Sequence, residues 1–351
     1  MNSYLIGIDY RNSPLGVRES VYRQRKEIER FWLAGSFRTG CILSTCNRFE
    51  VYSAANNLYE ALQRRMIFEE AFTQFRGRSY FEYGNEQVFM HGLRLAAGLA
   101  SQLKGEAQIL GQLEHWLGQE CFPGTLRQLW QEAIAGARLI RQRALLEEIN
   151  INIANVILED LMRLIPRKKA LKIIILGTGK VAGLFSQQNS AESKLYFVSH
   201  KNRSRAEELA CWSAGTVISF QDLTYLLPQA DALISAASCP HFLLRKDDVA
   251  RMHRKQVLYI YDLALPRNIA PEVAVVEKIL LRNLDDLSLL CKDHNAKIAS
   301  WLSLAERLAG EIIENRRIRE SFRNHTHWNK AESIGIEAGA RGLALTEEVV
   351  S

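Results

Sequence analysis

The sequence predicts an α/β multidomain protein, with an α+β region first, a parallel α/β region second and a long helix near the C-terminal end. The chain has 351 residues, more than one hydrophobic core usually holds, and 47% of them are apolar. Strand-like and helical segments alternate regularly over residues 171–284, and helical spacing continues without proline over 287–324. We therefore divide the chain into residues 1–155, 156–286 and 287–351.

Composition excludes several classes of protein. No uncharged apolar run reaches about 18 residues, and residues 1–10 lack the features of a signal peptide, so we expect a cytoplasmic protein without a membrane contact. The six cysteines include no C-x-x-C pair, and no H-E-x-x-H spacing occurs, so we predict neither disulfides nor a metal. A net charge of +6 permits an anionic partner such as RNA without demanding one, and the dispersed basic residues are typical of a solvated helix face. We expect no DNA partner.

The first region is expected to be mixed. Residues 3–8 and 41–55 are strand-like, whereas 58–72 and 86–117 have the three-to-four spacing of amphipathic helices. Residues 41–43 form a strand entering the core and 49–52 a strand leaving it, so residues 44–48 form an exposed bend.

This bend, within Ser44-Thr45-Cys46-Asn47-Arg48-Phe49-Glu50, presents a thiol. Loops at strand ends commonly carry reactive groups, and the thiolate of Cys46 is the form that attacks an acyl carbon. Arg48 either lowers the pKa of this thiol or binds a substrate carboxylate, and the sequence leaves both roles open. The competing interpretation is that Cys46 is a small buried apolar residue.

A second polar cluster occupies residues 101–112, within an otherwise helical pattern. By composition alone it is typical of a solvated helix face. His91 by itself is typical of a hydrogen-bonded structural histidine.

The second region contains a glycine turn, Gly177-Thr178-Gly179-Lys180-Val181-Ala182, which follows an apolar strand at 171–176 and begins a helix near Val181. Backbone amides at such a helix start bind the pyrophosphate of a dinucleotide, with Gly177, Gly179 and Ala182 lining the turn. Alternation of helices and strands predicts a Rossmann domain, although a sheet without a ligand is the competing interpretation. The further predicted strands are 194–199, 216–219, 232–235, 256–262 and 278–284.

Cofactor choice depends on the residues after the second strand. Residues 199–205 contain no carboxylate to hold the ribose hydroxyl of NAD, which favours NADPH. Asn202, Arg203 and Arg205 are the candidates for contact with its extra phosphate.

Residues 287–324 predict one continuous helix, about 55 Å long at 1.5 Å per residue. A helix of this length must bury its apolar stripe against other domains or another chain, and a homodimer is the first expectation.

Together these motifs resemble the glutamyl-tRNA reductase family over roughly residues 4–320. The bend around Cys46 is the most specific piece, and the other pieces occur in the same order. They are His91, residues 98–112, the glycine turn, Asp262-Leu263-Ala264-Leu265-Pro266-Arg267 and Asn283-Leu284-Asp285-Asp286-Leu287.

The resemblance implies NADPH-dependent reduction of glutamyl-tRNA to glutamate-1-semialdehyde through a cysteine thioester, the first step of five-carbon tetrapyrrole (porphyrin) synthesis. Cys46 would be the nucleophile, and His91 would match a histidine needed for full activity. Arg48 would hold the side-chain carboxylate of the glutamyl group. The glutamyl pocket would comprise Thr45, Asn47, Arg48, Ser101, Glu106, Ala107, Gln108 and Gln112.

The resemblance also implies how the three regions divide the work. Residues 1–155 would form the catalytic domain, 156–286 the NADP-binding domain through residues 177–182, and 287–351 a spinal helix with a truncated dimerisation region. The family forms a V-shaped homodimer, and direct transfer of the aldehyde to the aminomutase that follows is left open.

Departures from the family pattern occur at four positions and in the tail. Tyr10 and Asn12 stand where the family has histidine and threonine, Ala100 replaces aspartate and Lys180 replaces glutamate. Residues 325–351 form a short helical tail, smaller than the usual dimerisation domain.

Two alternative functions remain. The first is an NADP-dependent dehydrogenase of a small hydroxy or keto acid, in which Cys46 is only structural. The second is a non-catalytic RNA-binding redox sensor that has kept the cofactor fold.

Overall fold

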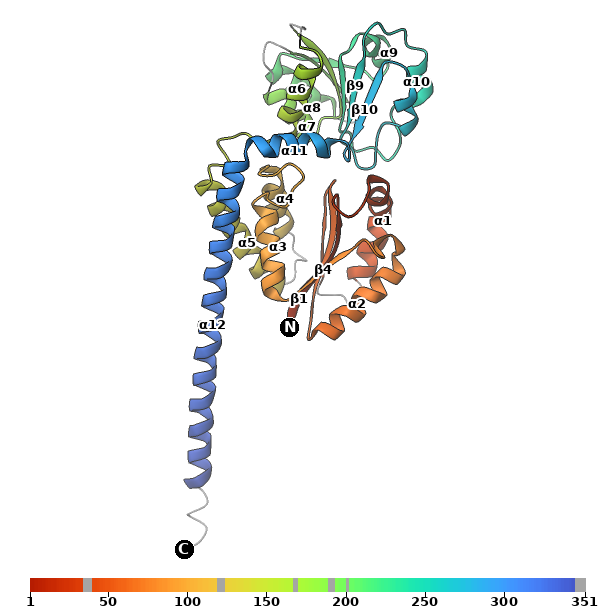
Figure 1. Ribbon diagram of the computed structural model, residues 1–351. Coiled ribbons are helices and arrows are strands. Elements are labelled where there is room, and N and C mark those ends of the chain that lie inside the picture. Colours follow the sequence, from red (N-terminus) through yellow and green to blue (C-terminus); the bar gives the residue numbers. More distant parts are fainter. Residues whose placement is uncertain (34–39, 119–123, 167–169, 189–192, 200–201, 345–351) are drawn as a thin grey trace.

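The computed structural model describes residues 1–33, 40–118, 124–166, 170–188, 193–199 and 202–344, the last 22 of these as helix backbone. Two sheet-containing regions lie one above the other, and a long helix runs down one side of the first (Figure 1). The predicted multidomain α/β class is confirmed.

The first region is built on a four-stranded antiparallel sheet in the order β2-β3-β1-β4. Its strands are β1 (Asn2–Asp9), β2 (Cys41–Ser44), β3 (Arg48–Ala55) and β4 (Tyr80–Tyr83). The predicted strands are present, and the chain bends between β2 and β3, where the Thr45 amide donates to the Arg48 carbonyl at 2.9 Å. The predicted bend around Cys46 is therefore confirmed.

Helices cover both faces of this sheet because alternate strand residues are apolar on each side. On one face, Ile6 packs with Trp32 and Phe68 of α1 (Leu15–Leu33) and α2 (Leu58–Ala71). On the other, Leu5 and Tyr52 pack with helices α3 (Asn85–Ala96), α4 (Gln108–Leu117) and α5 (Gly124–Arg143).

The helical pattern predicted over 86–117 is interrupted. Helix α3 ends at Ala96, and residues 97–107 form a loop in which Gly98 and Gly105 both have φ of +81°. A side chain at either position would be strained, and a Cβ on Gly98 would lie 2.9 Å from the Glu106 carbonyl. The polar residues Ser101, Gln102, Lys104 and Glu106 are therefore loop residues rather than one helix face.

The second region contains a six-stranded parallel sheet in the order β10-β9-β8-β5-β6-β7. This is the Rossmann order, with the topological switch between β5 and β8. The strands are β5 (Leu171–Leu176), β6 (Ser193–Val198), β7 (Thr216–Ile218), β8 (Ala232–Ser235), β9 (Leu258–Asp262) and β10 (Ile279–Asn283). The helices are α6 (Ile153–Leu164), α7 (Lys180–Gln187), α8 (Arg203–Ser213), α9 (Leu223–Leu226) and α10 (Lys246–Ala250).

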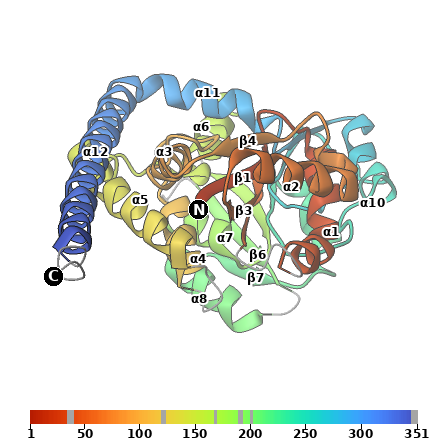
Figure 2. The ribbon, with the colours of Figure 1, turned by 90° about the horizontal axis from the view of Figure 1, so that it is seen from below.

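The prediction of one continuous C-terminal helix is wrong. Helix α11 (Leu287–Lys297) ends at Ile298, where φ is −104° and ψ is 20°, and α12 (Ala299–Ala344) continues in another direction. The change of direction lets α11 pack on α6 and α12 pack on α5 and α3 (Figures 1 and 2). Ile298 is buried at this corner. The helix breaks there because its two parts make apolar contacts with two different regions.

The two regions are joined by polar contacts between distant segments. Arg18 of α1 contacts Asp285 at 2.6 Å, and Glu19 contacts Arg267 at 2.7 Å. Gln102 donates from Nε2 to the Leu284 carbonyl at 2.9 Å. These contacts place the loop after α3 against the strand ends of the parallel sheet. In the described part of the chain, no helix has the length and apolarity needed to cross a bilayer.

Candidate functional site

A cavity of about 100 Å³ lies where the two regions meet. It contains residues from the bend after β2, the loop before α4, the start of α7 and the segments after β9 and β10. Most of the residues proposed for catalysis and substrate binding line it: Thr45, Cys46, Asn47, Arg48, Ser101, Glu106, Gln108 and Gln112. Val181, Leu263 and Leu284 reach it from the second region, so the thiol and the nucleotide fold face one space.

The bend holds Cys46 at the mouth of this cavity. The Thr45 hydroxyl oxygen accepts the amides of Asn47 and Arg48 at 3.3 and 3.2 Å, which closes the turn. The Cys46 side chain is exposed, as predicted, but it lies in a crowded cleft. Desolvation there, together with the Glu106 carboxylate, raises the pKa of the Cys46 thiol to about 11, while Arg18 and Arg48 oppose the rise. A nucleophilic thiolate therefore needs further stabilisation.

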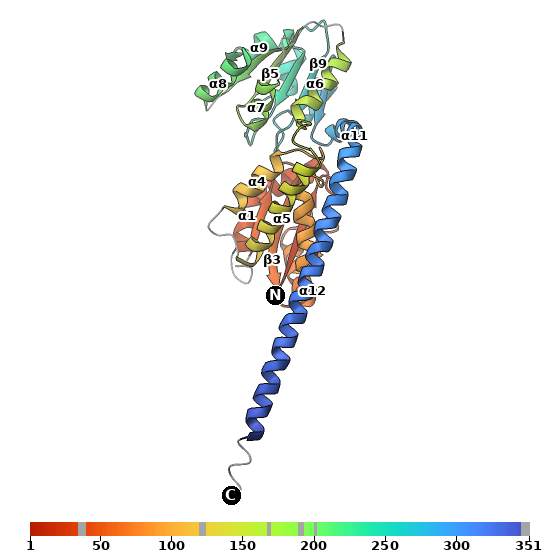
Figure 3. The same ribbon diagram turned by 90° about the vertical axis from the view of Figure 1, so that its left-hand side faces the viewer.

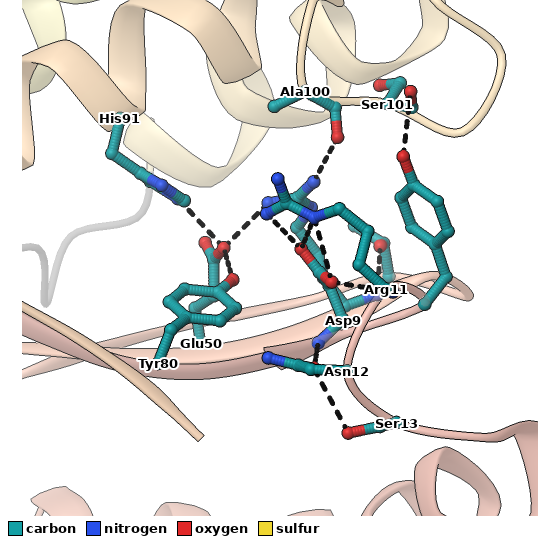
Figure 4. Close-up of polar contacts among 12 residues, drawn as sticks. Asp9, Arg11, Asn12, Ser13, Glu50, Tyr80, His91, Ala100 and Ser101 are labelled. Carbon is teal, nitrogen blue, oxygen red and sulfur yellow. Dashed lines mark hydrogen bonds and ion pairs between the residues drawn. The ribbon is translucent and has the colours of Figure 1, made fainter. Parts of the chain in front are cut away.

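Arg48 belongs to a buried polar cluster around Glu50, and Figure 4 shows Glu50 with Tyr80, His91 and Ala100. Its Nη1 donates to Glu50 Oε1 at 2.8 Å, and its Nη2 donates to the Ala100 carbonyl at 2.7 Å. The hydroxyls of Tyr52 and Tyr80 also donate to the Glu50 carboxylate. Although burial opposes its charge, His91 and Arg48 hold the pKa of Glu50 well below its usual range. Arg48 therefore fixes the bend to the loop after α3.

His91 lies on α3, with Nε2 2.9 Å from Glu50 Oε1, and does not line the cavity. Figure 4 shows it on the opposite side of Glu50 from Ala100. The imidazole therefore reaches the bend only through the Glu50 and Arg48 charges. Ala107 is likewise outside the cavity, at the exposed residue preceding α4.

Sequence reasoning missed the residue that holds the loop before α4. Arg141 of α5 is 1% exposed, and its Nη1 donates to the carbonyls of Ala97, Gly105 and Glu106 at 3.3, 2.9 and 3.2 Å. Glu106 thereby stays in the cavity, where desolvation raises its pKa to about 7. The sequence signal that could have identified Arg141 is its place, as a basic residue, on the apolar stripe of a helix.

Three departures from the family pattern join this network. The Tyr10 hydroxyl donates to the Ser101 carbonyl at 3.3 Å. Asn12 accepts the Asp9 amide at 2.8 Å, and the Ala100 carbonyl is the acceptor for Arg48. The differing side chains of Tyr10 and Asn12 thus make contacts of their own, and Ala100 contributes through its backbone.

The glycine turn fits a dinucleotide pyrophosphate. Gly177 has φ of +106°, and a Cβ there would lie 3.0 Å from Ala236 and Ala237 after β8. A Cβ on Gly179 would meet nothing within 4 Å, so the space beside the turn is open. Helix α7 begins at Lys180 without a side-chain cap, which leaves its first amides available to an anion. Thr178 is half-buried, and Ala182 packs in the core.

The candidates for the NADPH phosphate lie apart from the cavity, at the start of α8. Asn202 accepts the Arg205 amide at 3.1 Å and so caps the helix. Arg203 pairs with Glu207 at 2.9 Å and Arg205 with Glu208 at 2.6 Å, both on the surface. These residues follow β6 at the same edge of the sheet as the glycine turn, where a ribose phosphate would lie.

A second cavity, of about 540 Å³, adjoins the first and shares Thr45 and Gln112 with it. Lys180, the departure in the glycine turn, lines it together with His115 and Trp116. Within the residues that the structure describes, no three histidine, cysteine or acidic side chains are grouped as metal ligands.

Comparisons with known proteins match both regions. Residues 6–144 match the family described as "Glutamyl-tRNAGlu reductase, N-terminal domain", and residues 159–290 match "Shikimate / quinate 5-dehydrogenase". The second match indicates a nicotinamide cofactor. A glutamyl-tRNA reductase of Archaeoglobus fulgidus is 30% identical over 82% of this chain and 76% of its own length. One from Thermus thermophilus is 29% identical over 97% and 88%. The solved glutamyl-tRNA reductase from Methanopyrus kandleri is 22% identical, with a TM-score of 0.41 over 92% of this chain and 82% of that one.

Proposed function

This chain belongs to the glutamyl-tRNA reductase family, and we propose that it reduces glutamyl-tRNA to glutamate-1-semialdehyde with NADPH through a thioester on Cys46. The resemblance inferred from the motifs is thereby confirmed. The observation that carries the proposal is the cavity that Cys46 lines together with Val181 of the glycine-turn helix and Leu263, the residue after β9. The dehydrogenase and sensor alternatives are not favoured, because neither uses a thiol facing both regions.

The reaction begins at sulfur because a free carboxylate resists hydride addition, whereas an ester to tRNA is already activated. The Cys46 thiolate attacks the aminoacyl carbonyl carbon, the bond to the ribose oxygen breaks, and the glutamyl group becomes a thioester. When bound, NADPH supplies the hydride that reduces this thioester. The bond between the reduced carbon and the Cys46 sulfur then breaks, which releases the aldehyde.

The polar lining of the cavity suits a glutamyl group. Ser101, Gln108 and Gln112 offer hydrogen-bond donors and acceptors, and Glu106 offers a carboxyl for the α-amino group. Arg48 also lines the cavity, but its Nη1 and Nη2 are already bound, so its part is to set the position of the bend. His91 acts on the same bend through Glu50.

NADPH is the proposed form of the cofactor, with the glycine turn on its pyrophosphate and Arg203 and Arg205 near its ribose phosphate. The division into domains at 155 and 286 follows from these roles. Because α12 extends beyond the rest of the chain, we also propose a homodimer through its distal part (Figure 3).

The test measures aldehyde formation by the purified protein from glutamyl-tRNA with NADPH or NADH. Uncharged tRNA with free glutamate serves as the substrate control. Cys46→Ser should abolish the product, whereas Cys211→Ser, which changes another exposed thiol on α8, should retain it. Equal turnover by wild type and Cys46→Ser would refute the thioester, and equal rates with both nucleotides would refute the NADPH preference.

A further inference from the structure

Arg18 is a buried cation with donors to spare. It lies on α1, is 3% exposed, and donates from Nη2 to Asp285 Oδ1 at 2.6 Å. Its Nε and Nη1 are also buried, and neither has a hydrogen-bond partner among the residues that the structure describes. Leaving a buried donor unpaired destabilises the folded state, so folded proteins seldom retain one without a use.

The Arg18 guanidinium borders the bend that carries the thiol. With Ser44, Thr45 and Arg48 it lines a cavity of about 10 Å³, roughly the space of one water molecule. Thr45 and Arg48 line this small space on one side and the catalytic cavity on the other. Arg18 is thus adjacent to the turn on whose tip Cys46 stands.

The charge of the other nearby cation, Arg48, is neutralised more completely by its partner. The Arg48 guanidinium is paired with Glu50, which is fully buried and unscreened by solvent. The Asp285 side chain that pairs with Arg18 is 39% exposed, so solvent screens its charge. In keeping with this difference, Arg18 lowers the pKa of the Cys46 thiol more than Arg48 does.

We propose that Arg18 is the cation that stabilises the Cys46 thiolate for attack on the substrate ester. The thiol proton leaves Sγ for solvent at the exposed side of Cys46, and the electron pair left on sulfur forms the new bond to the acyl carbon. Asp285, from the segment after β10, holds the guanidinium by one donor and leaves two directed elsewhere. This inference deepens the proposed function and rests on Cys46 being its nucleophile.

The test follows alkylation of Cys46 by iodoacetamide as a function of pH, in the full-length protein without tRNA or nucleotide. Cleavage after Arg38 and Arg48 gives one peptide with both Cys41 and Cys46, so fragment ions must assign the modified thiol. Arg18→Gln should raise the pKa seen in alkylation by about one unit, which slows the reaction about tenfold below that pKa. Arg18→Lys, which keeps the charge, should react nearly as fast as wild type.

Two further variants separate a charge effect from simple docking of the two regions. Asp285→Asn removes the anion beside Arg18, so Cys46 should react faster. Arg267→Gln removes the neighbouring ion pair with Glu19 at the same junction and should leave alkylation unchanged.

The proposal is overturned if Arg18→Gln alkylates as fast as wild type, or if Arg18→Gln and Asp285→Asn slow the reaction alike. It is equally overturned if Arg18→Lys behaves as Arg18→Gln does. Because alkylation reports the thiol alone, a protein that shows the expected shifts but forms no aldehyde would refute the proposed function and not the role of Arg18.

Discussion

At the residue scale, the site is governed by charges held away from water. Glu50 is fully buried and ionised because Arg48, His91 and two tyrosine hydroxyls surround it. For Glu106, in contrast, Ser101, Arg48 and Arg141 offset the desolvation only in part, so its pKa is raised to about 7. The pKa values of these two carboxyls therefore shift in opposite directions, which follows from their surroundings rather than their type.

Glu106→Gln is expected to stabilise the protein at pH 8 and not at pH 4.5. The unfolded chain releases the Glu106 proton near pH 4.5 and the folded chain near pH 7, so wild type loses stability as pH rises through this window. Gln carries no charge and avoids that loss, a gain of about 1–3 kcal/mol at pH 8. Urea unfolding at the two pH values measures this change in the free energy of unfolding. Glu277→Gln, at a side chain 89% exposed, is the control and should show no such difference.

At the scale of elements, the loop of residues 97–107 is the segment whose structure local propensity predicts least well. Its two left-handed glycines let the chain leave α3 and return to begin α4, and Arg141 binds three of its carbonyls from the opposite helix. Ser101 and Glu106 reach the cavity only because this loop is not helical. The break at Ile298 has a similar origin, since two packing surfaces require two helix directions.

Arg141→Gln should loosen this loop. Three carbonyls lose their shared donor, so unfolding in urea should show a loss of about 1–3 kcal/mol. Thioester formation in a single turnover with glutamyl-tRNA should fall further than stability alone explains, because Glu106 is no longer held in place. Arg138→Gln, one turn away on α5 in an exposed pair with Glu114, is the matched control. Unchanged acyl transfer in Arg141→Gln would contradict this account of the loop.

At the scale of the whole molecule, α12 packs against the rest of the chain over only part of its length. Its first turns bury Leu302, Ala305 and Ala309 against α5 and α3, but its distal part extends past every other element in Figures 1 and 3. A helix without neighbours is marginally stable in water, because tertiary packing supplies most helical stability. This exposed length is the basis of the proposed homodimer.

Deletion of residues 323–351 should convert a dimer into a monomer in sedimentation velocity. Cys46 alkylation should remain at the rate of the full chain, because the bend, Arg18 and Asp285 all lie outside the deleted segment. A monomeric full-length protein, or a deletion variant that stays dimeric, would refute dimerisation through α12.

The sequence by itself determined the two sheets, the exposed bend at Cys46, the glycine turn and the family, because each depends on local periodicity or on a contiguous motif. It did not predict the loop after α3, the corner at Ile298 or the roles of Arg18 and Arg141. Arg18 reads locally as one more charge on an amphipathic helix, and only its burial beside Asp285, 267 residues away, makes its unpaired donors meaningful. Tertiary structure decided these features because desolvation and long-range pairing depend on which segments meet in space.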